Sequence, residues 1–523
     1  MVRPLLAGAY RSLRALPRLD VLPRDSVLPR FFVLSCSLAL LVSVVPFVTP
    51  PSEAQFDDPS GGLSGGNHIR VWIEDPDREA SYLNQFDLQF TRGAWTVAAR
   101  LEFDEEERLD PESSLGIRRR YAEYHGDAAT LRAGTFYATF GRGLLLRSEE
   151  DETVRIDRDL DGVHGTLHWR TMEGQAFVGQ PRNDDTHERD DLLSGAEMNL
   201  RLRPRLRIGA GYVRMDTRDE EASEAHESDL APGKPVEELF GGHIEWSHGI
   251  LDAALEGARR LVWGTRDARE GWIGIDGEHG HAFYGSVALG VPGYSWLIEG
   301  KHYDRFDAPY STLPPVNSDG QPINDGRDEY GAGVTLLASQ GDVTYETAWS
   351  YATADDEPGE RLAAEGSLRR DWWGRGALEL GAEWIEETEL ESHSYRSYAG
   401  PLLEATYYLG PEVSLEFHGK FFAWTNEVRG SQRQQYNETT ADLSLSFGAS
   451  RAVTLSVLTA SDPVVEYEND DTWISLELAW GFGYSQDLKI KIGDERGGVV
   501  CSGGICHYEP PFSGVRFELV SRF

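Results

Sequence analysis

The feature that most constrains this chain is an alternation of apolar and polar residues that begins near Asn67 and continues to the last residue. Residues 343–351 read VTYETAWSY, which places the aromatic side chains on one face and Glu346 on the other. Residues 378–384 (LELGAEW), 413–421 (VSLEFHGKF) and 488–492 (LKIKI) repeat the pattern. Successive side chains of a strand point to opposite faces, so this pattern predicts two-faced strands, and we count about 24 of them (22–26).

The connections between these segments differ in length in a regular way. After even-numbered strands they are short, as at Gly126-Asp127 and Met172-Glu173. After odd-numbered strands most are long and acidic, as at 104–110 (DEEERLD) and 218–229 (RDEEASEAHESD). Unequal rims are typical of membrane barrels, and a sheet in hydrocarbon must close to pair its backbone. The sequence therefore predicts an all-β, transmembrane, antiparallel up-and-down β-barrel with short periplasmic turns and long acidic extracellular loops. The alternative is a large soluble all-β protein such as a propeller.

The N-terminal region predicts export from the cytoplasm. Six arginines precede the apolar run 31–48 (FFVLSCSLALLVSVVPFV), and positions 52 and 54 hold the small residues Ser52 and Ala54. This order is that of a signal peptide, whereas an uncleaved membrane anchor is the alternative. We expect a signal peptide over 1–54, a short periplasmic segment over 55–66 and the barrel over 67–523. The expected location is the outer membrane of a Gram-negative-type bacterium.

The charge balance bears on what the barrel can contact. The formal net charge is −37, which argues against nucleic acid as a partner because phosphates require a basic face. An acidic mouth would concentrate cations and repel anions. Alternation places mixed charges on the inward face, where they would contact water. These expected lumen charges are Arg100, Glu102, Glu346, Glu379, Glu383, Glu416, Lys420, Lys489 and Lys491.

The C-terminal strand ends in phenylalanine, with Phe517, Leu519 and Phe523 on one face. This ending resembles the signal by which bacterial outer-membrane barrels reach their assembly machinery. Residues 137–147 (YATFGRGLLLR), 156–162 (IDRDLDG) and the ending from Val500 resemble a porin-like family of uncharacterised outer-membrane barrels with a domain of unknown function. The resemblance implies a fold and a location, and it brings no substrate and no catalytic residues.

Cys501 and Cys506 lie in the connection before the last strand, separated by SGGI. In an oxidising compartment two such cysteines are expected to form a disulfide in an extracellular loop. A zinc site is the alternative, but it needs further ligands and only His507 is adjacent.

Asp157, Asp159 and Asp161 occupy alternate positions before Gly162, as in the first half of a calcium-binding loop. Position twelve of that template is His168 instead of glutamate, so calcium is a candidate ligand and an ordinary solvated turn is the alternative. No other cofactor is expected.

The same connection, 137–161, contains three consecutive leucines, which is unusual for an external loop. One hypothesis is that it folds into the barrel and narrows the lumen, with Arg142 and Arg147 facing the pathway. The alternative is a hydrophobic patch that covers the rim. The residues of this expected constriction are Arg142, Leu144, Leu145, Leu146 and Arg147.

No catalytic motif supports an enzyme. Gly62-Leu-Ser-Gly-Gly66 matches Gly-x-Ser-x-Gly, but a nucleophile elbow needs a preceding strand and a following helix. We expect a porin-like channel for passive or gated passage of small solutes, surrounded by outer-membrane lipid. The alternative is a non-conducting surface barrel whose acidic loops bind calcium or a protein partner. The sequence indicates neither the solute nor the oligomeric state.

Overall fold

The structure is a computed structural model of the chain. It describes residues 61–523 except 75–80, 106–113, 152–155, 183–188, 190, 217–235, 268–270, 275–278, 309, 317–327, 355–358, 373, 390–393, 428–432, 462–471, 484, 503–504 and 510. The expected signal peptide (1–54) and the acidic stretch 218–229 lie outside the described residues. No helix in the described part of the chain is long and apolar enough to cross a membrane.

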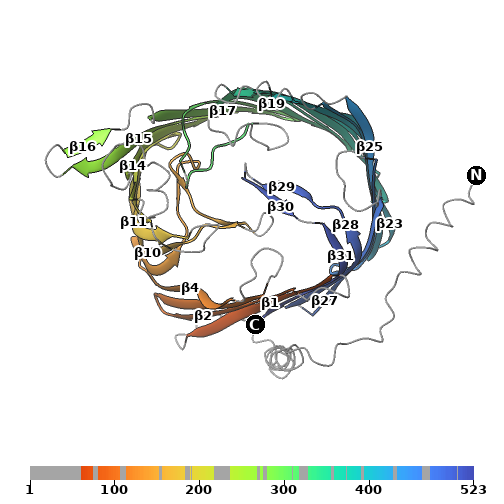
Figure 1. The fold of residues 1–523 in the computed structure, drawn as a ribbon, viewed down its shortest axis with the longest axis horizontal. Helices are drawn as coiled ribbons and strands as arrows, with labels where there is room; N and C mark the ends of the chain where they lie inside the picture. Colours follow the sequence, from red (N-terminus) through yellow and green to blue (C-terminus); the bar gives the residue numbers. More distant parts are fainter. Residues whose placement is uncertain are drawn as a thin grey trace, which may run out of the picture.

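The described strands form one closed antiparallel barrel (Figure 1). The main sheet holds 25 strands, of which β16 (Gly271–Gly274) pairs only with β15, so 25 − 1 = 24 strands make the ring. The ring closes where β1 pairs with β31, from Gly66 opposite Arg522 to Glu74 opposite Gly514. The predicted fold is confirmed.

The ring follows chain order, and each strand pairs with the next. Its members are β1 (Gly62–Glu74), β2 (Ser81–Arg92), β3 (Trp95–Glu105), β4 (Ser114–His125), β5 (Ala129–Phe136), β10 (Leu160–Trp169), β11 (Met172–Pro181), β12 (Leu192–Arg203), β13 (Leu206–Asp216), β14 (Val236–His248), β15 (Leu251–Asp267), β17 (Gly280–Val291), β18 (Tyr294–Asp304), β19 (Glu329–Gln340), β20 (Val343–Ala354), β21 (Gly359–Asp371), β22 (Gly376–Glu389), β23 (Ser394–Gly410), β24 (Val413–Glu427), β25 (Gln434–Phe447), β26 (Arg451–Ala460), β27 (Thr472–Phe482), β28 (Gln486–Glu495) and β31 (Phe512–Arg522).

Short strand pairs lie in the connections. They are β6 (Thr139–Phe140) with β7 (Leu146–Arg147), β8 (Glu150–Asp151) with β9 (Ile156–Asp157), and β29 (Gly498–Ser502) with β30 (Ile505–Glu509). In Figure 1 the β29–β30 hairpin projects across the barrel opening.

The two rims differ as the sequence predicts. At one rim the connections have two to four residues, and at the other they reach 24 residues, between β18 and β19. The short turns use glycines at positive φ, such as Gly93 (φ 59°) and Gly249 (φ 65°), as tight hairpin turns require. The start of β1 and the end of β31 meet at the short-turn rim, where Gly65 and Phe523 exchange two backbone hydrogen bonds of 2.9 Å.

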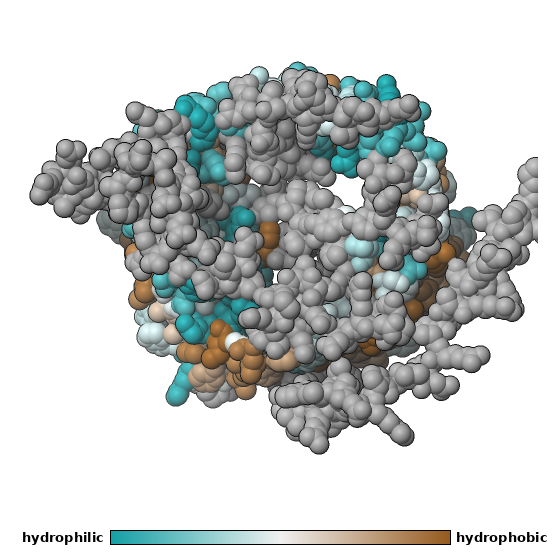
Figure 2. Space-filling model, in the orientation of Figure 1, coloured by the Kyte–Doolittle hydropathy of each residue, from teal (hydrophilic) through white to brown (hydrophobic). Residues whose placement is uncertain are grey.

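The two faces of the wall differ in polarity. Trp349, which is 60% exposed, lies on the outer face of its strand, whereas Glu346 on the same strand points inward. Figure 2 shows hydrophobic residues gathered along the lower outer edge of the ring. Hydrocarbon surrounds the outer face of a membrane barrel, so exposure of these residues is expected. β1 begins at Gly62, earlier than the expected boundary at Asn67, because its glycine-rich start carries no alternating signal but still pairs with β2.

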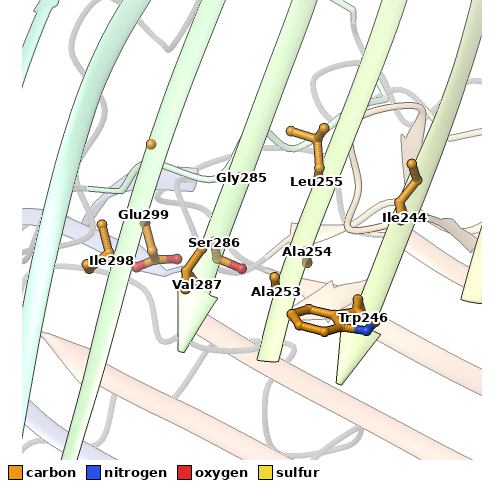
Figure 3. Close-up of a pocket in the computed structure, with 11 residues that line it drawn as sticks. Ile244, Trp246, Ala253, Ala254, Leu255, Gly285, Ser286, Val287, Ile298 and Glu299 are labelled. Atoms are coloured by element: carbon orange, nitrogen blue, oxygen red, sulfur yellow. The ribbon is translucent and has the colours of Figure 1, made fainter. Parts of the chain in front are cut away.

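The outer wall also carries a shallow groove of about 500 Å³ across β14, β15, β17 and β18 (Figure 3). Trp246, Leu255 and Ile298 line it with their apolar side chains. All three belong to the exposed apolar set of the exterior. The groove is therefore part of the lipid-facing surface and is separate from the lumen.

Candidate functional site in the barrel lumen

The connection between β5 and β10, residues 137–159, enters the ring; we call it the first lumen loop (Figure 1). Its apolar residues Phe140, Leu144 and Leu146 are fully buried, and Leu145 is nearly so. They form one cluster with side chains from strands β11 to β18. The wall residues of this cluster are Phe177, Leu193, Val213, Met215, Leu239, Ala258, Ala282, Tyr284 and Tyr303.

Glycines on the inner wall provide the space that this loop occupies. A Cβ atom at Gly211 would lie 2.7 Å from Leu145 Cδ1, and one at Gly241 would lie 2.9 Å from Leu145 Cδ2. A Cβ atom at Gly195 would lie 3.0 Å from Phe140 Cε2. Cβ contacts under 3.0 Å are essentially never seen and one of 3.0 Å is unusually tight, so a larger residue at these positions would require the Leu145 or Phe140 side chain to shift.

Two wall carboxylates hold the tip of the loop. Glu197 accepts the backbone N–H of Gly141 at 2.7 Å, and Glu256 accepts that of Arg142 at 2.8 Å. Gly141 has φ 59°, a conformation that favours glycine. The exposed Arg142 guanidinium lies 5.5 Å from the Tyr284 ring centroid. The tip is thus attached to the wall and presents a cation to the lumen.

The far end of the loop is attached through Glu150. Arg100 on β3 donates to Glu150 at 2.6 Å and to Asp87 at 2.8 Å, and Arg119 on β4 donates to Glu150 at 2.5 Å. Burial favours the neutral carboxyl, but the Arg100 and Arg119 charges outweigh it and lower the pKa of Glu150 below its ordinary value. Glu150 is therefore an ionised anchor at neutral pH.

A second segment, residues 305–316 after β18, packs against the first; we call it the second lumen loop. Phe306 is fully buried in the same cluster, and Tyr310 packs against that cluster. The N–H of Arg147 donates to the Tyr310 carbonyl at 2.8 Å, and that of Thr312 donates to the Gly143 carbonyl at 3.0 Å. The two lumen loops therefore form one hydrogen-bonded unit.

A buried ion pair fixes the second lumen loop to the wall. Lys301 on β18 and Glu329 on β19 are in contact, and both side chains are fully buried. Lys301 also donates to the Pro315 carbonyl, and the Tyr303 hydroxyl donates to the Pro314 carbonyl at 2.9 Å. Sequence reasoning does not find this loop, because its apolar residues are scattered and its anchors lie far apart in the chain.

Comparison with known proteins gives one family match, which covers the N-terminal part of the barrel. The profile of a family of unknown function, DUF6029, matches residues 64–319. A search of curated proteins found no match. A closed even-numbered barrel with an apolar outside and a charged inside is the architecture of bacterial outer-membrane proteins. The chain is an outer-membrane β-barrel protein.

Solved structures with similar folds are remote in sequence. The outer-membrane protein OpdK of Pseudomonas aeruginosa is 12% identical, with TM-score 0.39, covering 66% of this chain and 98% of that one. The P pilus usher PapC translocation pore is 10% identical, with TM-score 0.44, covering 88% and 99%. The siderophore receptor PirA of Pseudomonas aeruginosa is 10% identical, with TM-score 0.45, covering 89% and 81%.

The aspartates that suggested calcium have arginine partners in this barrel. Asp157 accepts from Arg182 at 3.3 Å, Asp159 pairs with Arg182 at 3.2 Å, and Asp161 pairs with Arg120 at 2.9 Å. Among the described residues, no group of three or more His, Cys, Asp or Glu side chains is placed to hold a metal. Arginine guanidinium groups are thus the described partners of these three carboxylates, and calcium binding stays a prediction.

The wall across the lumen from the two loops carries most of the expected lumen charges. Alternation places them on the face opposite exposed apolar neighbours: Glu379 precedes Leu380, Glu383 lies on the same face as Glu379, and Lys420 precedes Phe421. Glu102, on β3, is paired with Arg118 at 2.8 Å. In Figure 2 a gap is visible inside the ring beside β19 and β25. The remaining charges on this face are Glu346, Glu416, Lys489 and Lys491.

The two cysteines lie in the connection before the last barrel strand, β31, as the sequence predicts. Cys501 lies directly opposite Cys506 in the β29–β30 hairpin. Opposite residues of antiparallel strands have Cα atoms about 4.5–5.5 Å apart, within the range of a disulfide. Their side chains lie outside the described residues, so the bridge stays a prediction. On β31, Phe517 pairs with Val71 and Leu519 with Ile69, and Phe523 directly follows the strand at the short-turn rim.

Proposed function

We propose that this barrel is a porin-like channel for small solutes and that the two lumen loops form its constriction. The observation that carries the proposal is their joint attachment to the inner wall of β11–β18, through the apolar cluster and through Lys301 and Glu329. The opposite wall keeps charged, water-compatible side chains. Such an arrangement narrows a lumen from one side without filling it.

Barrel size supports a need for such a constriction. Diameter grows with strand number, and barrels of 16–18 strands already enclose an aqueous channel. A ring of 24 strands without internal segments would be wide and unselective. Loops that fold inward are therefore the part of this chain that can set the size of the passing solute. The proposal is a transport role and includes no enzymatic activity.

The lining favours cations. The chain carries 87 acidic and 50 basic residues, and glutamates prevail over lysines on the wall facing the loops. An acidic, partly desolvated passage raises the local concentration of cations and repels anions. The proposed solutes are thus small neutral or cationic molecules. The expected surroundings remain outer-membrane lipid, with the C-terminal strand as the proposed signal for the barrel-assembly machinery.

Conductance in planar lipid bilayers tests the proposal. The mature protein should give discrete ion-conducting steps, and deletion of residues 140–150 should increase their size several-fold. Heat-modifiable migration in gels would verify that the deletion variant still forms a barrel. A closed record at all salts and voltages would instead favour a non-conducting surface barrel. Equal step sizes in both proteins would show that the first lumen loop is not the constriction.

A further inference from the structure

One seam in the barrel wall is closed by side chains. β4 pairs with β3 from Ser114 to Tyr124, but with β5 only from Tyr121 to His125. β5 ends at Phe136, where the chain enters the first lumen loop. Residues 114–120 of β4 therefore have no ladder partner on the edge that faces β5, among the described strands.

Side chains supply the missing backbone partners. The Arg120 N–H donates to Thr135 Oγ1 at 3.1 Å, and Arg182 Nη2 donates to the Arg118 carbonyl at 3.3 Å. Unpaired backbone groups are costly in hydrocarbon, which explains why polar side chains gather here. A charged cluster in the wall of a membrane protein is itself a functional-site hypothesis.

A cavity of about 380 Å³ opens at this seam on the outside of the barrel. Leu115 and Ile117, which are 78% and 54% exposed, mark its lipid-facing edge. The Arg120 side chain is 64% exposed, and its described side-chain contact is with Asp161 at 2.9 Å. The polar lining consists of Arg118, Arg120, Thr135, Asp161, Arg182 and Arg189.

The depth of the cavity can be judged along β10. Trp169 lies at the short-turn end of this strand and Asp161 at the other, eight residues away. At about 3.3 Å per residue and a tilt near 40°, this separation is about 20 Å along the membrane normal. The apolar band of such barrels is about 25 Å tall. The cavity therefore lies near the level where outer-leaflet acyl chains meet their head groups.

We infer that this seam binds the phosphate group of an outer-leaflet lipid, with an acyl chain against Leu115 and Ile117. Arg182 and Arg189 are held by Asp159, at 3.2 and 2.5 Å, and form a fixed positive wall. Arg120 is the exposed donor: a guanidinium has five N–H groups, and the contact with Asp161 uses one. Guanidinium groups bind phosphate oxygens in a bidentate manner, which suits this geometry.

Native mass spectrometry of the detergent-solubilised protein tests the inference with three probes: phosphatidylglycerol, diacylglycerol with the same chains, and inorganic phosphate. Wild type should retain phosphatidylglycerol in preference to diacylglycerol, and Arg120→Gln should reduce that preference about tenfold, the value of one charge-assisted contact. Arg370→Gln is the matched control. Arg370 is similarly exposed (61%) and paired with Asp342 at 3.4 Å, but it lies beside a turn of the short-turn rim.

Two results would overturn the inference. One is an unchanged lipid preference in Arg120→Gln when this variant migrates as a folded barrel. The other is displacement of phosphatidylglycerol by inorganic phosphate at an equal concentration, which would assign the cavity to a free anion instead of a lipid. An Arg189→Gln variant gives a second reading, because it weakens the positive wall without changing the exposed donor.

Discussion

The backbone N–H of Arg147 lies 2.8 Å from the carbonyl oxygen of Tyr310 and donates a hydrogen bond to it. These residues are separated by more than 160 positions, yet the contact joins the two lumen loops inside the barrel. Because each loop also has its own wall anchors, release of either one should loosen the other.

The inner-wall glycines against which the first lumen loop packs should control the single-channel conductance. Gly211→Val adds atoms where even a Cβ would lie 2.7 Å from Leu145 Cδ1, so the loop should leave the wall and single-channel conductance should rise. Gly290→Val is the matched control, since a Cβ there meets nothing within 4 Å. Wild-type conductance in a folded Gly211→Val barrel would contradict the packing role of this glycine.

The buried pair Lys301–Glu329 should contribute strongly to stability. Lys301→Met leaves a buried carboxylate without its cation, and removing one partner of such a pair costs about 3–5 kcal/mol. Denaturant unfolding in lipid vesicles would measure the loss. The double variant Lys301→Met/Glu329→Leu should recover most of it, because an apolar pair of similar volume needs no partner. A double variant as unstable as the single one would show that the charges themselves are required.

Attachment of the first lumen loop should resist acid until the Glu150 carboxylate is protonated. The pKa of Glu150 is lowered, so the ion pairs with Arg100 and Arg119 stabilise the loop above the ordinary glutamate pKa and are lost as pH falls through the lower, folded-state value. Channel records should therefore be alike at pH 7 and pH 5 and become noisier only at more acidic pH. Glu150→Gln should be noisy throughout, since it loses two charge-assisted contacts worth about 1.5–3 kcal/mol each. Identical noise in both proteins at pH 7 would show that Glu150 is not an anchor.

Cys501 and Cys506 should be bridged in protein purified without reductant. Their opposite positions in the β29–β30 hairpin bring the Cα atoms within disulfide range. Intact mass should rise by about two units on reduction, and thiol labelling before reduction should not modify either residue. Because the closed loop is small, Cys501→Ser/Cys506→Ser should leave barrel stability nearly unchanged. Two free thiols in untreated protein would rule the bridge out.

The barrel was predictable from the sequence for two reasons. Each strand carries the two-residue alternation as a local signal, and the lengths of the connections distinguish the two rims. The role of Gly195, Gly211 and Gly241 in accommodating the first lumen loop was not predictable, since a glycine in a strand gives no sign of what fills the space beside it. The Lys301–Glu329 pair and the second lumen loop depend on contacts across strands, which no local pattern encodes. The arginine partner of Asp157 and Asp159 was not predictable for the same reason, because Arg182 follows another strand.

The inner wall opposite the lumen loops should set ion selectivity. Glu379 and Glu383 on β22 and Glu416 on β24 face the lumen, so the triple Gln variant should have a reversal potential closer to zero in a KCl gradient than wild type. Lys489→Gln/Lys491→Gln on β28 is the control of opposite sign, and it should increase cation preference because it removes positive charge from the same surface. Both shifts should shrink in 1 M salt, where the screening length is about 3 Å. If the two variants shift the potential in the same direction, or not at all, ions do not pass along this wall.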